Sequence, residues 1–116
     1  MSDVLRLIVG RTAQDVAADF LSAWKRTDHG ETVRERILSF ENWEGLAAVM
    51  TGERYRLLRY LHGHPEPSVS SLARALGRQY RRVHEDVVAL EGAGLVVRGA
   101  GEVRATADRI EAEIRL

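Results

Sequence analysis

The chain has 116 residues, of which 45% are apolar and 29% charged, a composition that fits a folded domain and excludes a disordered chain. It has no cysteine, which excludes disulfides, thiolate zinc sites and cysteine nucleophiles. Seventeen basic side chains balance seventeen acidic ones, no apolar run has the length of a membrane span, and the start does not resemble a signal peptide, so we expect a soluble, cytoplasmic protein with no membrane partner.

The zero net charge hides an uneven distribution. Residues 51–104 carry nine basic and six acidic side chains, a net charge of +3, whereas the segments before and after them are acidic. Within this block, 67–84 contains four arginines and no acidic residue. Arginine is the better fork-shaped donor to phosphate and to guanine edges, so this distribution favours a nucleic-acid partner.

The first 50 residues predict a strand-helix-strand arrangement followed by a short helix. The expected elements are a strand at 4–9, a helix from a Thr12 N-cap to about Thr27, a strand at 33–40 and a helix at 42–50. Apolar side chains recur at helical spacing in both helices. We therefore expect Phe20, Trp24 and Trp43 to belong to the core and not to a binding pocket.

The pattern changes at Thr51, which can cap a helix over 52–62 with Tyr55, Leu58 and Leu61 on its buried side. Prolines then break the chain at 63–67. The elements expected next are a short helix capped by Ser68 or Ser70, a tight turn at Gly77, a helix over 79–91, a hairpin of 95–98 with 102–105 and a strand at 110–116. Strict alternation in the last strand predicts one buried face.

The order helix, short helix, glycine turn, long helix and hairpin is that of a winged helix-turn-helix. In that fold the second helix of the pair enters the major groove and the hairpin lies beside it near the phosphates. A helical projection of 79–91 gives a buried stripe and an outward face. The stripe comprises Tyr80, Val83, Val87 and Leu90, the outward face Arg78, Arg81, Glu85 and Ala89, and the flanks Arg82 and His84.

A plainer interpretation of the same helix is a self-neutralising solvated surface. Arg81 and Glu85 are four residues apart, and so are Arg82 and Asp86, which is the spacing of ion pairs on an exposed helix. The full order of elements, with Gly77 and the 99–101 turn, favours DNA binding.

Two segments also resemble a known family. The stretch Gly77-Arg-Gln-Tyr-Arg-Arg-Val-His-Glu-Asp-Val-Val-Ala-Leu-Glu-Gly-Ala-Gly-Leu-Val and the stretch Leu38-Ser-Phe-Glu-Asn-Trp-Glu-Gly-Leu are similar to small MarR-like predicted transcriptional regulators. The resemblance spans about 37–116. It implies a winged-helix reader in which Tyr80, Val83, His84 and Asp86 match the recognition-helix motif. Many such proteins are the antitoxin-like partner of a two-gene toxin–antitoxin pair.

The sequence thus predicts an α+β fold, a winged helix-turn-helix with an N-terminal strand-helix-strand extension and a C-terminal strand. The expected domains are 1–41 for dimerisation or partner binding, 42–105 for DNA binding, and 106–116 as a further dimer contact. The two terminal strands need partners, which could be each other, the 33–40 strand, or a second chain.

The function expected is a homodimeric repressor that binds double-stranded DNA without a cofactor. The candidate DNA-binding residues are Ser70, Arg78, Gln79, Tyr80, Arg81, Arg82, His84, Glu85, Arg98 and Arg104. Two alternatives stay open: a protein-interaction module that neutralises a toxin partner, and a MarR-type repressor that responds to a small molecule.

Enzymes and metal sites fit the sequence less well. There is no nucleophile elbow, phosphate-binding loop or zincin motif, so we expect no catalytic residues. The acidic pairs Glu41/Glu44 and Glu111/Glu113 are expected to be surface charge. His62 and His64 lie two residues apart, on different faces of a helix, so we expect no metal ligands.

Overall fold

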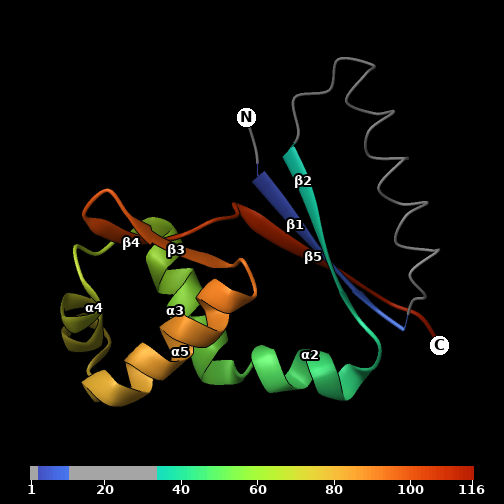
Figure 1. Cartoon of the computed structure of the whole chain (residues 1–116), viewed down its shortest axis with the longest axis horizontal. Helices are drawn as coiled ribbons and strands as arrows, with labels where there is room; N and C mark the ends of the chain where they lie inside the picture. Colours follow the sequence, from blue (N-terminus) through green and yellow to red (C-terminus); the bar gives the residue numbers. More distant parts are fainter. Residues whose placement is uncertain (1–2, 11–33) are drawn as a thin grey trace. The chain divides into compact units, whose positions relative to one another are not determined.

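The computed structural model describes residues 3–10 and 34–116, which form an α+β structure. In chain order the described elements are β1 Asp3–Val9, β2 Arg34–Phe40, α2 Trp43–Val49, α3 Gly52–Gly63, α4 Val69–Leu76, α5 Tyr80–Gly92, β3 Val96–Gly99, β4 Glu102–Ala105 and β5 Arg109–Ile114 (Figure 1). The helix predicted after Thr12, with Phe20 and Trp24, lies outside the described residues. None of the described helices is long and apolar enough to cross a membrane.

The chain divides into two units. Unit 1 comprises Met1–Ala48 and Ala107–Leu116, and unit 2 comprises Val49–Thr106. The boundary differs from the predicted 42–105 domain at its start, because all of α2 except Val49 belongs to unit 1. The C-terminal strand likewise belongs to unit 1 and does not form a segment of its own.

Unit 1 contains a three-stranded sheet in the order β2-β1-β5, with β1 parallel to both neighbours. Leu7 of β1 lies opposite Leu38 of β2 and Ala112 of β5. A parallel strand in the middle of a sheet is covered on both faces, which explains why β1 is a nearly continuous apolar run. Five of its seven residues are buried: Val4, Leu5, Leu7, Ile8 and Val9. Of the three partners left open for the terminal strands, β1 pairs with two, β5 and β2.

Two predictions about apolar side chains in unit 1 are wrong. The alternating apolar side chains of β5 do not form a buried face, since Ile110 is 38% and Ile114 50% exposed. The alternation of apolar and charged residues determines which side chains share a face of the strand, but not whether that face is covered. Because β5 is an edge strand, it has a neighbouring strand, β1, on one side only. Trp43, expected in the core, is also exposed at the first turn of α2, and Leu46 is the residue that this helix buries.

Unit 2 packs α3, α4 and α5 with the β3–β4 hairpin around one core. The fully buried side chains from these elements are Leu57, Leu61, Leu72, Val83, Val87, Leu90 and Leu95. Leu58 is buried as predicted, but Tyr55 is exposed, because Leu57 and not Tyr55 completes the buried side of α3.

The connection from α4 to α5 is a tight turn. Ser68 is the N-cap of α4, and its hydroxyl accepts the Ser71 amide while the Ser71 hydroxyl accepts the Ser68 amide, a reciprocal capping box. Gly77 ends the helix with φ of 66°, a left-handed conformation in which a side chain is strained. Three residues after Gly77, α5 begins at Tyr80, so the connection between α4 and α5 is short.

The β3–β4 hairpin is antiparallel, and its turn at Ala100 and Gly101 has positive φ at both residues, as the twist of a two-residue hairpin requires. Glu66, in the loop before α4, exchanges two backbone hydrogen bonds with Val103 of β4. The hairpin is therefore tied to the loop between α3 and α4 as well as to the core.

Candidate nucleic-acid interface

The helix α5 has a buried side and an outward side, as its sequence predicts. Val83, Val87 and Leu90 are inaccessible to solvent. The Arg81 side chain is 91% exposed, and Arg82 and Glu85 are also exposed. The predicted Arg81–Glu85 pair is present at 3.7 Å between Nε and Oε1. Such a pair between exposed side chains stabilises a helix by only about 0.2–0.5 kcal/mol. Arg81 can therefore leave Glu85 for a stronger anion.

Arg82 differs from Arg81 in its surroundings. Within residues 3–10 and 34–116 its guanidinium group has no hydrogen-bond or ion-pair partner. The Asp86 carboxylate, which was expected to pair with it, binds Arg54 and Arg78 instead. Arg82 and Arg81 line a hollow of about 550 Å³ at the N-terminal end of α5. The remaining lining residues are Thr51, Glu53, Arg78, Gln79, Glu85 and Asp86.

The N-terminus of α5 has no side-chain cap. Gln79 is the N-cap residue, with φ of −63° and ψ of 135°, and its side chain makes no capping hydrogen bond to the helix amides. The first amides of a helix carry partial positive charge and lack partners within the helix. Together with Arg81 and Arg82, they form a donor-rich surface that favours phosphate and base acceptors.

Tyr80 does not belong to the buried stripe. Its side chain is 53% exposed, and its ring lies against the His84 ring with the centroids 5.7 Å apart. The predicted burial of Tyr80 is therefore wrong, and its ring lies on the surface of α5 next to the His84 ring.

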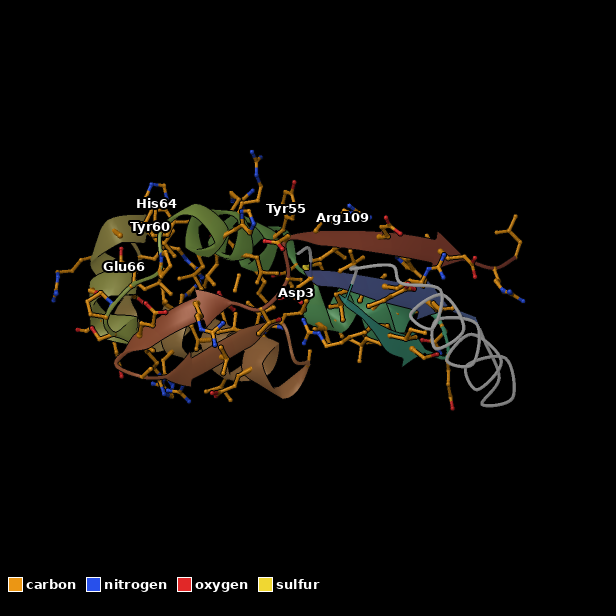
Figure 2. The ribbon with its side chains drawn as sticks, turned by 90° about the horizontal axis from the view of Figure 1, so that it is seen from above. Asp3, Tyr55, Tyr60, His64, Glu66 and Arg109 are labelled. Atoms are coloured by element: carbon orange, nitrogen blue, oxygen red, sulfur yellow. The ribbon has the colours of Figure 1, made fainter. Side chains whose placement is uncertain are left out.

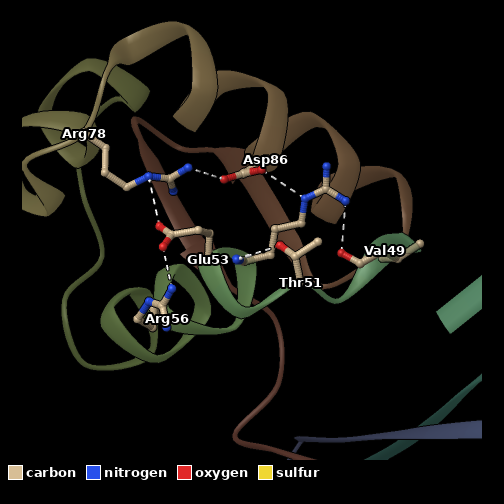
Figure 3. Close-up of polar contacts among 7 residues, drawn as sticks. Val49, Thr51, Glu53, Arg56, Arg78 and Asp86 are labelled. Atoms are coloured by element: carbon tan, nitrogen blue, oxygen red, sulfur yellow. Dashed lines mark hydrogen bonds and ion pairs between the residues drawn. The ribbon is translucent and has the colours of Figure 1, made fainter. Parts of the chain in front are cut away.

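Arg78 is not on the outward face either. Its guanidinium bonds Asp86 on α5 at 2.8 Å and Glu53 on α3 at 3.2 Å, and only 21% of its side chain is exposed (Figure 3). Its Nη1 is buried and has no hydrogen-bond partner among the residues that the structure describes. Arg78, expected as a DNA contact, forms an ion pair that joins the turn after α4 to α5.

Asp86 is the centre of this cluster. It also accepts a hydrogen bond from Arg54 Nε at 3.0 Å, and Arg54 Nη1 donates to the Val49 carbonyl at 3.0 Å. The cluster of Arg54, Arg78 and Asp86 therefore holds α5 against the start of α3. Sequence reasoning missed it, although Asp86 stands three residues after Val83 and four before Leu90, which is the spacing of the buried stripe.

The cluster continues to the surface through Glu53. This carboxylate bonds Arg56 one turn along α3 as well as Arg78. The hydrogen bond from Arg56 is the main reason why the pKa of Glu53 lies below its ordinary value. Glu53 therefore stays ionised beside Arg78.

The hairpin arginines are exposed but paired. Arg98 makes two hydrogen bonds to Glu91 at the end of α5, which lower the pKa of the Glu91 carboxyl. Arg104 lies 3.7 Å from Glu102 on its own strand. The turn at 99–101 has no basic side chain, so any contact of the hairpin tip with phosphate would use backbone amides.

Ser70 lies exposed on α4 and does not cap it. It is one residue past the start of the helix, on the element that precedes α5. Of the predicted site residues, the structure brings five together at one hollow, namely Arg78, Gln79, Arg81, Arg82 and Glu85, whereas Tyr80 and His84 lie against each other outside it. Ser70, Arg98 and Arg104 do not line this hollow.

A second polar cluster joins the last turn of α3 to the loop that follows (Figure 2). The Tyr60 hydroxyl donates to Glu66 at 2.6 Å, and the His64 ring stacks on Tyr60 with the centroids 4.8 Å apart. The hydrogen bond from Tyr60 lowers the pKa of Glu66. Because the Glu66 backbone is bonded to Val103, this cluster braces the hairpin. Its residues do not line the hollow at α5.

Metal ligands and acidic pairs can be placed as well. Across the part of the chain that the structure describes, no group of three or more His, Asp or Glu side chains is arranged to hold a metal ion. Glu41 and Glu44 are exposed at the start of α2, and Glu111 is exposed on β5.

The comparisons with known proteins give one match. No curated protein and no solved structure matches the chain. The sequence model of the HVO_A0114 family matches residues 49–112, which is more than half of the chain and includes α3, α4, α5 and the hairpin. The chain therefore belongs to the HVO_A0114 family.

Proposed function

We propose that this protein is a winged helix-turn-helix transcriptional regulator that binds double-stranded DNA through the outward face of α5. The observation that carries the proposal is the exposed pair Arg81 and Arg82 at the uncapped start of α5, directly after a short helix and a fixed turn. In this arrangement α4 braces α5, and the N-terminal residues of α5 meet the base edges in the major groove.

The roles within this surface follow from the contacts. Arg82, without a partner among the described residues, is the residue we assign to a base edge or phosphate, and Arg81 joins it by exchanging Glu85 for DNA. We assign Tyr80 and His84, whose rings lie against each other, to packing against the sugar-phosphate backbone. Arg98 and Arg104 would reach phosphates only by giving up exposed ion pairs, which stabilise a fold little.

The proposal predicts salt-dependent binding to duplex DNA. Two to four arginines per chain would each displace about one counterion, so log K should fall with log[salt] with a slope of roughly −2 to −4 per chain. Raising the salt from about 50 mM to about 200 mM should weaken binding by a factor of roughly 10 to 150. Fluorescence anisotropy with labelled duplex measures this. Binding that is absent at low salt, or that is insensitive to salt, contradicts the proposal and favours a protein partner instead.

A further inference from the structure

The edge strand β5 presents an apolar face that nothing in its own sheet covers. It is the outer neighbour of β1. Its residues Ile110 and Ile114 are exposed, and so is Leu116, two residues beyond the end of the strand. An edge strand of this kind is a template for pairing with another strand. The other edge strand, β2, has no comparable series, because its apolar residues Leu38 and Phe40 are partly buried and the preceding residue on that face is Arg36.

The sequence of β5 and the residue after it reads the same in both directions: Arg109-Ile110-Glu111-Ala112-Glu113-Ile114-Arg115. A twofold interface joins the same patch of two identical chains, so it requires a surface that is complementary to itself. Apolar residues alternate here with charges of both signs, so two antiparallel copies are complementary in a register that sets Glu opposite Arg and apolar residues opposite each other.

We propose that β5 pairs antiparallel with β5 of a second copy of this chain, about a twofold axis that passes through Glu113. The two three-stranded sheets then continue into one. This inference concerns unit 1, goes beyond DNA binding, and holds or fails independently of it.

The register follows from side-chain chemistry. In an antiparallel pair, residues directly opposite each other point to the same side of the sheet. The apolar faces of the two copies therefore share one side only if some residue lies opposite its own copy, on the twofold axis. With Ala112 on the axis, Glu111 would oppose the partner's Glu113 and Arg109 the partner's Arg115, which is unfavourable. With Glu111 on the axis, Ile114 would oppose the partner's Asp108. With Ile114 on the axis, only 112–116 would be paired with one another, and Ile110 would have no apolar residue of β5 opposite it.

With Glu113 on the axis, the pairs are matched. Glu111 opposes the partner's Arg115, Ala112 the partner's Ile114, and Ile110 the partner's Leu116. The single like-charge pair, Glu113 with its copy, is offset by Arg115, whose Nε lies 3.3 Å from the Glu113 carboxylate in the same chain.

The backbone suits this pairing. Arg115 turns its amide toward β1, where it donates to the Val9 carbonyl. In a regular parallel ladder the amides alternate, so those of Ala112 and Ile114 face the free edge and are placed to bond the second copy. Glu113 then occupies a non-hydrogen-bonded position, where Cβ atoms of opposite residues lie close together, about 4.5–5.5 Å apart.

The first test is the mass in solution without DNA. Light scattering over a dilution series should find a species of twice the 13.0 kDa chain mass, and Ile114→Lys should shift it to the single-chain mass at the same concentrations. Val88→Lys is the matched control, because Val88 is similarly exposed, at 46% against 50%, but lies on α5; it should stay dimeric. Circular dichroism checks that each variant folds. A wild-type chain that is always monomeric, or an Ile114→Lys variant that remains dimeric, overturns the proposal.

The second test fixes the register. Because the chain has no cysteine, each single-cysteine variant reports one position. Under mild oxidation Glu113→Cys should form a covalent dimer fastest, ahead of Glu111→Cys and Ala112→Cys, with Val88→Cys as the background rate. Fastest crosslinking at position 111 or 112, or no rate above the background, contradicts the Glu113 axis.

Discussion

Replacing Asp86 by alanine is expected to lower the free energy of unfolding by about 3–5 kcal/mol, the cost of removing one partner from a buried ion cluster. The Asp86 side chain is 13% exposed, and those of Arg54 and Arg78 are 18% and 21% exposed. The substitution leaves two mostly buried guanidinium groups facing each other without the carboxylate between them. Urea denaturation followed by circular dichroism measures the loss.

Glu85 provides the matched control for this experiment. It is the preceding acidic residue on the same helix, but its side chain is 64% exposed and its only described pair is with Arg81. Glu85→Ala should change the unfolding free energy by less than about 0.5 kcal/mol. If Asp86→Ala costs no more than Glu85→Ala, the cluster does not hold α5 in place, and the account of Arg78 as a structural residue is wrong.

Replacing Arg82 by alanine is expected to lower the affinity for operator DNA about tenfold or more without loss of stability. A base-edge arginine contributes about 1–3 kcal/mol of discrimination, whereas an exposed arginine contributes little to folding. Arg81→Ala should also lower the DNA affinity without loss of stability. Its effect on affinity should be smaller, because Arg81 must first leave Glu85 to reach DNA. Fluorescence anisotropy gives the affinity and a thermal melt gives the stability.

Arg59→Ala has the same change in net charge and tests whether position matters. Arg59 is exposed on α3, over the Tyr55 ring, and does not line the hollow at α5. Its loss should leave DNA affinity nearly unchanged. If the Arg59 and Arg82 variants lose affinity equally, the interaction is a general attraction between charges and α5 is not the reader.

The sequence predicted the elements of unit 2 well, because each has a strong local signal. Ser68 with Ser71, Gly77, and the Ala100-Gly101 turn fix where helices and strands begin and end through short-range hydrogen bonds and backbone geometry. Such signals do not depend on distant parts of the chain. The pairing of β1 with β5 was predicted only as one of three options, since apolar patterning shows that a strand needs a partner but not which one.

The candidate site was harder to predict for a different reason. A helical projection tells which residues share a side, but not which charged side chain a neighbouring helix will bind. Asp86 lies on the buried side only because Arg54 on α3 and Arg78 in the turn neutralise it there. Arg78 pairs with Asp86 in this triad, and Tyr80 is exposed, which are the two differences from the predicted faces of α5.

The central claim is that duplex DNA binds on the outward face of α5, and amide chemical shifts of the ¹⁵N-labelled chain titrated with a short duplex test it most directly. The account predicts the largest changes over Gln79–Glu85, smaller ones in the β3–β4 hairpin, and none in β1 or β5. Largest changes elsewhere, with α5 unaffected, would contradict it.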